Sequence, residues 1–302
     1  MNWDVAHRIA GIAAIQAHRD LDVDRSTYVR VHGALGAAGL IGMAKSMPRL
    51  FGVYRSPDDG GPAVLLNARL DVITQRHTAA HELGHHRLAH RSAYDNELDP
   101  SLRWGNGSWP DEEKVAEAFA AWFLMPRPAV LAALERIAGG RPTAPEHAYL
   151  LARALGTSYT GTVRHLARLS QVDRGRAEQW LKITPATLKR SLTRGAAVSP
   201  DAHVHAVTTR MHGRRLHVDA ADLLVLHPPG ALIDRLPEAL SLWPEPGDRI
   251  GTSSLEHPTI VEVTHGMDTE CRLALSVPGT DEPLEVTLVR ESPRSGIDEI
   301  WP

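Results

Sequence analysis

The sequence predicts an α+β protein organised in three zones. Three observations lead to this class: residues 1–139 mix helical periodicity with short strand patterns, residues 140–200 are helical, and residues 201–302 alternate apolar runs with Pro/Gly turns. The length of 302 residues allows two or three domains. We therefore expect a domain of helices plus a small β-sheet, then a helical middle region, then a small all-β C-terminal domain.

The first zone is predicted to combine helices with a small sheet. Apolar residues recur at helical spacing behind Asp4, which can serve as an N-cap. Helical patterns cover residues 5–13, 26–35, 77–90 and 111–125. Strand patterns cover residues 49–54 and 63–66, on either side of a loop rich in Pro, Asp and Gly. The polar stretch at residues 92–110 is expected to be a loop.

The second and third zones differ in their periodicity. Short helices are expected at residues 145–155, 159–169, 174–181 and 185–194. Strands are expected at residues 214–218, 223–226, 259–264, 272–277 and 284–290. We expect the histidines of the third zone to lie on solvated strand faces; they are His203, His205, His212 and His217. Cys271 is expected to pack inside a strand rather than act as a redox switch.

The composition excludes several classes of protein. With 43% hydrophobic and 23% charged residues the chain is not disordered, and a net charge of -3 argues against a broad polyanion-binding role. A single cysteine excludes a disulfide framework and every multi-cysteine zinc site. The longest uncharged apolar stretch, residues 34–44, is too short to span a bilayer, and charged residues interrupt any signal peptide near the N-terminus. We therefore expect a soluble cytoplasmic protein with no membrane partner.

The most informative motif is His-Glu-x-x-His, inside a segment with a helical pattern. Four residues advance a helix by about 400°, so His81 and His85 face the same side one turn apart and can bind one zinc ion. Glu82 can reach a water on that metal and act as a general base. The alternative is a surface helix that carries two histidines by chance. The small and apolar residues around the motif favour instead a helix that is buried against a sheet.

A catalytic zinc site needs a third protein ligand and an open position. The metzincin pattern is excluded, because Leu88 and Arg91 occupy the two positions where it requires Gly and His. The downstream helical segment supplies carboxylates. Glu113 shares a helical face with small alanines that would let this helix approach the motif helix closely. Glu112 and Glu117 are competing ligands that spacing alone does not dismiss.

Three other residues near the motif have a weaker case. His86 and His90 are displaced from His85 by about 100° and 140° around a helix, so both are poor ligand positions. We expect His90 to be a surface histidine, with a role behind the ligands or in stabilising the transition state as the alternative. Tyr94, in the predicted loop, is another candidate for stabilising the tetrahedral intermediate.

Two segments together are specific enough to indicate a family. They read R-x-T-x-A-H-E-L-G-H at residues 76–85 and E-x-x-A-x-x-F-A-A-x-x-L-M-P at residues 113–126. This pair resembles the ImmA/IrrE family of zinc-dependent metallopeptidases, and the strand at Ala63–Asn67 is similar to the edge strand of that family. The likeness covers about residues 1–135 and continues loosely through the helical zone.

The resemblance implies a zincin-like, gluzincin-type domain over residues 1–139. It places the zinc ligands at His81, His85 and Glu113 and the catalytic glutamate at Glu82. The chain departs from the family at Glu117, where Asn is frequent, and at His77, where the family has Phe or a similar residue. Neither departure removes a ligand, but a carboxylate at position 117 near the metal would change the local charge or the substrate preference.

The resemblance also implies a substrate. Members of the family cleave a helix-turn-helix repressor, often encoded beside them, and so switch on stress, phage or mobile-element genes. The substrate backbone is expected to add as a strand along the edge near Ala63–Asn67. Residues 201–302 hold no cluster of catalytic side chains, so we expect them to gate the protease, with a passive docking module for the repressor as the alternative.

The middle zone provides an alternative function. Residues 151–158 followed by 162–166 have the spacing of a helix-turn-helix unit with basic residues on the second helix. A regulator that binds a repressor or DNA without proteolysis is therefore the second hypothesis. Short helical pairs of this kind are also common packing units, and the complete His-Glu-x-x-His motif argues for the enzyme.

Overall fold

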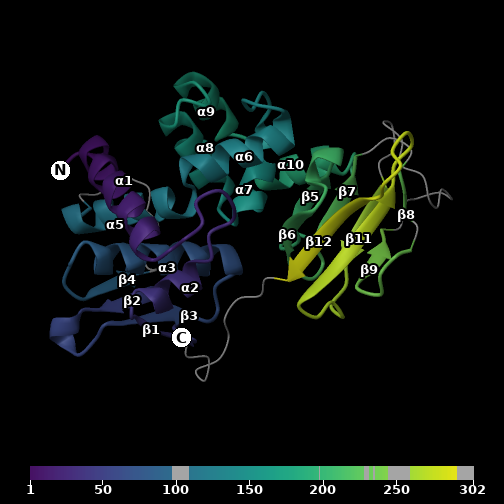
Figure 1. Ribbon diagram of the computed structural model, residues 1–302. Coiled ribbons are helices and arrows are strands. Elements are labelled where there is room, and N and C mark those ends of the chain that lie inside the picture. The colour runs from purple at the N-terminus through teal and green to yellow at the C-terminus, as the bar shows by residue number, and fades with distance from the viewer. Residues whose placement is uncertain (97–108, 197, 228–230, 234, 244–258, 291–302) are drawn as a thin grey trace. The chain divides into compact units, whose positions relative to one another are not determined.

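The computed structural model describes residues 1–96, 109–196, 198–227, 231–233, 235–243 and 259–290 (Figure 1). By its internal contacts the chain forms two compact units. The first contains Met1–Val130 and Leu155–Gly161, and the second contains Leu131–Ala154 and Thr162–Ser292. The predicted α+β class is confirmed. The domain boundaries at residues 139 and 200, and the gating role expected for residues 201–302, stay predictions.

The first unit contains a four-stranded sheet. Its strands are β1 (Ile41–Lys45), β2 (Leu50–Arg55), β3 (Ala63–Asn67) and β4 (Ala93–Asn96), in the order β1-β3-β2-β4. The predicted strands at 49–54 and 63–66 are confirmed as β2 and β3. The prediction of a loop throughout residues 92–110 was wrong, because β4 pairs with β2 there. Residues 97–108 of that stretch lie outside the described part of the chain.

The position of β3 corrects the expectation that Ala63–Asn67 forms an edge. β3 pairs in parallel with β1 on one side and antiparallel with β2 on the other. Both of its backbone edges are therefore occupied, and no further strand can add to it. The strands at the two ends of the sheet are β1 and β4.

Four helices of the first unit position the site. They are α1 (Trp3–Asp20), α2 (Val31–Ala37), α3 (Val72–Arg87) and α5 (Asp111–Leu124). In Figure 1, α3 lies between the sheet and α5, and it packs against β2, β3 and α5. Alanines line the buried face of α1, so that α1 and α5 pack closely within the same apolar core. The motif helix is thus covered on both sides, as the apolar residues around the motif predicted.

The motif helix begins earlier and ends earlier than its predicted range of 77–90. The Asp71 side chain accepts hydrogen bonds from the amides of Ile73 and Thr74, both at 3.0 Å, and so caps the first turn. At the other end α3 stops at Arg87, and Ala89 adopts a left-handed φ of 53°. His90 therefore does not continue the helix, and its expected position around the helix was wrong.

Five more helices follow along the chain. They are α6 (Arg127–Ala138), α7 (Pro145–Leu155), α8 (Tyr159–Arg168), α9 (Arg174–Trp180) and α10 (Pro185–Leu192). The four helices predicted for the middle zone are present at nearly the predicted bounds, and α6 is an addition. Whether the middle region has a helix-turn-helix fold stays a prediction. No single helix of the described chain is long and apolar enough to cross a membrane; α5 and α6 pass such a test only together, as a bent pair.

The second unit also contains two four-stranded sheets that share one core. Their strands are β5 (Val204–Val207), β6 (Arg214–Val218), β7 (Leu223–Leu226), β8 (Leu232–Ile233), β9 (Leu240–Leu242), β10 (Thr259–Val263), β11 (Glu270–Ser276) and β12 (Leu284–Arg290). The sheet orders are β5-β7-β10-β9 and β6-β12-β11-β8. Apolar side chains of both sheets form one cluster, and Cys271 packs half-buried against it.

The expectation that the histidines of this zone lie on solvated strand faces was wrong for His205, and His203 is partly buried. His205 lies on β5, a strand whose four residues are all buried, and is 3% exposed. Its Nε2 lies 2.9 Å from Oδ2 of Asp222, which is also buried. A histidine in such a strand is retained because a carboxylate satisfies its ring nitrogen.

Candidate metal centre

The two motif histidines lie on one face of α3, as their spacing requires. Both are buried, and their Nε2 atoms are 3.1 Å apart. Burial lowers the pKa of His85, and this effect outweighs the hydrogen bond that Glu113 makes to its ring. The His85 imidazole is therefore neutral at neutral pH, which is the form that binds a metal ion.

The third group comes from α5. Oε2 of Glu113 lies 3.1 Å from Nε2 of His81, and Oε1 lies 3.5 Å from Nε2 of His85. Burial alone would raise the pKa of Glu113, but the hydrogen bonds and charges of the two histidines lower it well below its ordinary value. The carboxylate is therefore ionised, as a metal ligand must be.

Close packing of α3 on α5 makes this convergence possible. A Cβ atom placed on Gly84 would lie 3.2 Å from the Cα atom of Ala116 and 3.0 Å from the Phe119 ring. Residue 84 therefore has to be small, and the alanines of α5 let the two backbones approach. Because Glu113 lies one turn before Ala116, this contact brings its carboxylate to the two histidines, as the small residues predicted.

These three side chains fit a zinc ion. One ligand atom from each of His81, His85 and Glu113 lies within 4.8 Å of the other two, the only such group found in the described part of the chain. Two imidazoles and one carboxylate are a donor set of catalytic zinc sites, which keep one position open. The Glu113 side chain is 29% exposed, whereas those of the two histidines are nearly closed off, so solvent reaches the group at Glu113. The site thus favours Glu113 over Glu112, which is exposed on the same helix.

Glu117, the other competing ligand, contacts His81 on the ring nitrogen that faces away from Glu113. Its Oε2 lies 3.5 Å from Nδ1 of His81 and 2.8 Å from Nε2 of His77. Burial alone would raise the pKa of Glu117, but the His77 charge and hydrogen bond lower it well below its ordinary value. An ionised carboxylate at Nδ1 favours a proton on that nitrogen and leaves Nε2 for the metal. The two departures from the family pattern, at 77 and 117, therefore contact each other.

His90 contacts the second ligand in the same manner. The turn at Ala89 brings the His90 amide back to the carbonyl of His85, and the Nδ1 atoms of the two rings lie 3.0 Å apart. If Nε2 of His85 holds a metal, Nδ1 of His85 carries the ring proton and donates a hydrogen bond to Nδ1 of His90. Burial lowers the pKa of His90, which keeps its Nδ1 able to accept. His90 is thus half-buried behind a ligand rather than a surface histidine.

The remaining predicted residues lie elsewhere. His86 is not one of the three convergent groups, and its Nδ1 lies 3.2 Å from the hydroxyl of Tyr54. Tyr94 lies on β4, where its backbone pairs with Val53, and its side chain is outside the described part of the structure. Its expected role in stabilising the transition state stays a prediction.

The expected general base lies at the interface of α3 with the sheet. Glu82 is completely buried. A Cβ atom on Gly52 of β2 would lie 2.6 Å from Oε1 of Glu82 and 2.5 Å from Thr78. The absence of a side chain at Gly52 therefore leaves the space beside β2 that the Glu82 carboxylate occupies. Any larger residue at position 52 would displace this carboxylate.

Sequence reasoning missed several residues that support the site. These residues are Gly52, Tyr54 and buried Arg76. The Tyr54 ring stacks on that of His85, with 6.2 Å between the ring centroids. The Arg76 guanidinium donates to the carbonyls of Val29 and Gly156, at 2.9 and 3.1 Å. One signal was available: His77 precedes His81 by four residues and so shares its helical face.

Comparison with known proteins agrees with this geometry. Residues 45–159 match the family model Peptidase_M78, the IrrE N-terminal-like domain. The matched range contains β2, β3 and β4, the whole of α3 and the whole of α5, which carries Glu113. The chain therefore contains a metallopeptidase-type domain. More particularly, it carries the domain of the ImmA/IrrE family, as the two segments at 76–85 and 113–126 predicted.

Other comparisons add little. A search among curated proteins finds no match. Among solved structures, the cysteine protease inhibitor EhICP2 from Entamoeba histolytica is 22% identical; the alignment covers 31% of this chain and 100% of that one, with a TM-score of 0.21. A likeness at this TM-score carries no argument about the fold or the function.

Proposed function

We propose that this chain is a zinc-dependent endopeptidase. The observation that carries the proposal is the convergence of His81, His85 and Glu113 on two packed helices of a metallopeptidase-type domain. A bound zinc ion would polarise the scissile carbonyl and lower the pKa of a water molecule. Glu82 follows the first ligand directly, and we assign it the role of accepting the proton of the attacking water and delivering it to the leaving amine.

The edge of β4 is our proposed docking site for the substrate backbone. β4 ends the sheet and pairs only with β2 among the described strands, so one row of its backbone groups is available to an extended peptide. β4 also follows His90 by only a few residues, which keeps this edge near the second ligand. Residues 93–96 thus replace 63–67 as the expected substrate strand.

The proposed substrate is a helix-turn-helix repressor whose removal derepresses stress, phage or mobile-element genes. The support is the likeness of residues 76–85 and 113–126 to the ImmA/IrrE family, together with the match to its domain. A high-specificity peptidase of this kind would make one cut rather than degrade its substrate. The proposed location is the cytoplasm, where such a repressor acts.

The metal assignment is tested by zinc content after dialysis. Glu113→Ala should lose stoichiometric zinc, since two histidines alone form an incomplete site. Glu112→Ala is the matched control, because Glu112 is exposed on the same turn of α5 and should leave zinc unchanged. Full zinc retention by Glu113→Ala would remove Glu113 from the ligand set.

The activity is tested with the repressor encoded beside the gene. The wild-type chain should produce a single discrete cut, and Glu82→Gln should bind zinc normally yet produce none. An intact repressor under inducing conditions, with zinc bound, would overturn the proposed substrate. Cleavage by Glu82→Gln at the wild-type rate would overturn the role of Glu82.

One observation favours a second candidate, a regulator that acts without proteolysis. Arg164 and Arg168 are exposed on α8, the second helix of the predicted helix-turn-helix unit, which is the helix that contacts DNA in such units. The two candidates are separated by complementation of a deletion strain with Glu82→Gln. Full complementation would favour the regulator, and loss of function with normal zinc content would favour the peptidase.

A further inference from the structure

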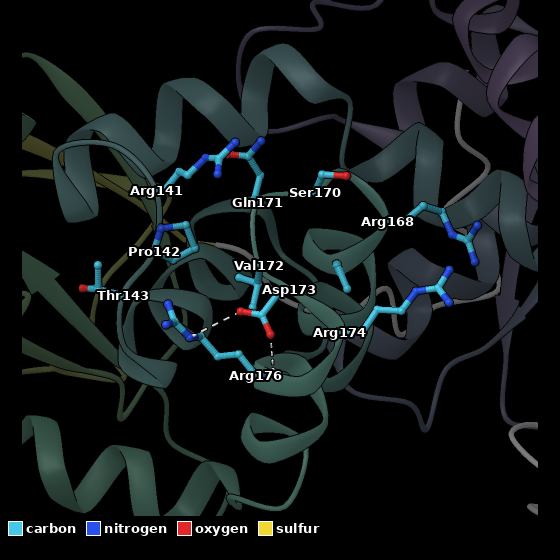
Figure 2. Close-up of a pocket in the computed structure, with 11 residues that line it drawn as sticks. Arg141, Pro142, Thr143, Arg168, Ser170, Gln171, Val172, Asp173, Arg174 and Arg176 are labelled. Atoms are coloured by element: carbon cyan, nitrogen blue, oxygen red, sulfur yellow. Dashed lines mark hydrogen bonds and ion pairs between the residues drawn. The ribbon is translucent and has the colours of Figure 1, made fainter.

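The second unit contains a pocket that the peptidase proposal does not use. It has a volume of about 590 Å³ and lies between the 141–143 segment, the last turn of α8 and the first turn of α9. Four of its lining residues are arginines: Arg141, Arg168, Arg174 and Arg176. Figure 2 shows the guanidinium groups of Arg141 and Arg176 to one side of the view and those of Arg168 and Arg174 to the other. We call this the arginine pocket.

We propose that the arginine pocket binds a small anion that contains a diphosphate group. The charge of the lining is the first reason. The described residues that line the pocket include four arginines and one carboxylate, Asp173, which gives this lining a net charge of +3 in a chain with a net charge of -3. Arginine stays protonated at any physiological pH, so this charge is permanent.

Asp173, the carboxylate among the described lining residues, is already engaged within its own helix. Asp173 caps α9: its Oδ1 accepts from the Arg176 amide at 2.8 Å, and its Oδ2 lies 3.7 Å from Nε of Arg176. Arg141 and Arg174 are exposed, and no hydrogen bond or ion pair joins either guanidinium to another described residue. The structure therefore gathers positive charge in a concave site whose own negative group is already engaged.

The shape favours a small ligand over a duplex. A volume of about 590 Å³ falls within the usual range for small-molecule pockets. Guanidinium groups bind phosphate oxygens through paired hydrogen bonds, and several on different sides of a pocket suit a compact group with more than one phosphate. None of the described residues that line the pocket is aromatic, so this lining does not offer the stacking surface of single-strand nucleic-acid sites.

The hydroxyl of Ser170, a neutral group of the lining, also suits a ligand that contains phosphate. Ser170 occupies a left-handed turn with φ of 56°, at the end of α8, where glycine is the usual residue. Serine at this position places a hydroxyl at the pocket in spite of the backbone cost. A hydroxyl can donate a further hydrogen bond to a phosphate oxygen.

Titration calorimetry on the full chain tests the proposal, with inorganic pyrophosphate as the probe. We expect saturable binding at a single site and weaker binding of inorganic phosphate. The double variant Arg141→Gln with Arg174→Gln should weaken pyrophosphate binding by about tenfold or more, because it removes two guanidinium partners without breaking a contact of the fold. Arg190→Gln, an exposed arginine on α10 outside the pocket, is the matched control and should bind as the wild type does.

ADP separates the two sources of a diphosphate group. Tighter binding of ADP than of pyrophosphate assigns the pocket to a nucleotide, and equal or weaker binding assigns it to an inorganic diphosphate; both results require loss of affinity in the double variant. The proposal is overturned if pyrophosphate fails to bind at about 1 mM to the folded wild type, or binds equally to the double variant. It is also overturned if a short DNA duplex binds through these arginines and pyrophosphate does not compete.

Discussion

Replacement of Gly84 by alanine tests whether close helix packing, rather than the ligands alone, creates the metal centre. The added Cβ atom would lie 3.2 Å from the Cα atom of Ala116 and 3.0 Å from the Phe119 ring. Carbon atoms prefer separations of about 3.5–4.0 Å, so α3 and α5 would have to separate by about half an ångström. A backbone atom cannot rotate away, so the movement is shared by the residues of α5, Glu113 included.

Two opposing effects set the stability change. Alanine in place of glycine in a helix gains about 1 kcal/mol from backbone entropy. Overpacking of a dense interior costs about 1–3 kcal/mol. We therefore expect Gly84→Ala to lower the free energy of unfolding by up to about 2 kcal/mol. Zinc sites tolerate only about 0.2 Å in ligand distances, so zinc affinity should fall by about tenfold or more.

Gly11→Ala is the matched control, because it makes the same chemical change in α1 without the overlap. A Cβ atom there would meet the Trp122 ring at 3.5 Å, an ordinary contact. This variant should raise the free energy of unfolding by up to about 1 kcal/mol and leave zinc affinity unchanged. Urea unfolding of the metal-free proteins and a zinc competition titration measure both effects. If Gly84→Ala is as stabilising as Gly11→Ala and binds zinc equally well, the packing argument is wrong.

Three further predictions follow from buried polar groups. Glu117→Gln should weaken zinc binding by about tenfold to a hundredfold, because an amide offers no negative charge to Nδ1 of His81; unchanged affinity in a competition titration would contradict this. Burial, together with the charge of Arg153, lowers the pKa of His203 to about 3 in the folded protein. His203 therefore stays neutral in the folded state at pH values where it is protonated in the unfolded chain, below about pH 6.5. Stability is then complete above that pH and falls as the pH drops toward 3, by at most about 1.4 kcal/mol per pH unit, and His203→Gln should reduce this loss in urea unfolding measured between about pH 7 and pH 5. Arg76→Met should cost about 3 kcal/mol or more, because buried carbonyls lose a charged donor; a cost below about 1 kcal/mol would show that water replaces it.

The sequence by itself determined the local part of the site. His81 and His85 lie together because a helix repeats about every 3.6 residues, and that relation needs no other part of the chain. The small residues Ala116 and Ala120 predicted the close approach of the second helix for an equally simple reason, since only small side chains permit it. The predicted helices of the middle zone were also confirmed, because caps and apolar periodicity are local signals.

Only the tertiary structure decided which carboxylate joins the histidines. Glu112, Glu113 and Glu117 lie within six positions on one helix, so the rotation of α5 about its axis relative to α3 decides their roles. It brings Glu113 to the two histidines, leaves Glu112 exposed and places Glu117 behind His81. The turn at Ala89 likewise returns His90 to His85, which no helical projection would predict.

Long-range pairing decided the rest. β3 is interior because β1 pairs with it in parallel, and β4 is an edge because it pairs with β2 alone among the described strands. Strand order depends on such partners, which are distant in the chain. His205 became buried because β5 joins a sheet and Asp222 offers it a partner from another segment. Periodicity reports which face of an element is apolar, whereas the neighbours that cover that face are set by the free energy of packing the whole chain.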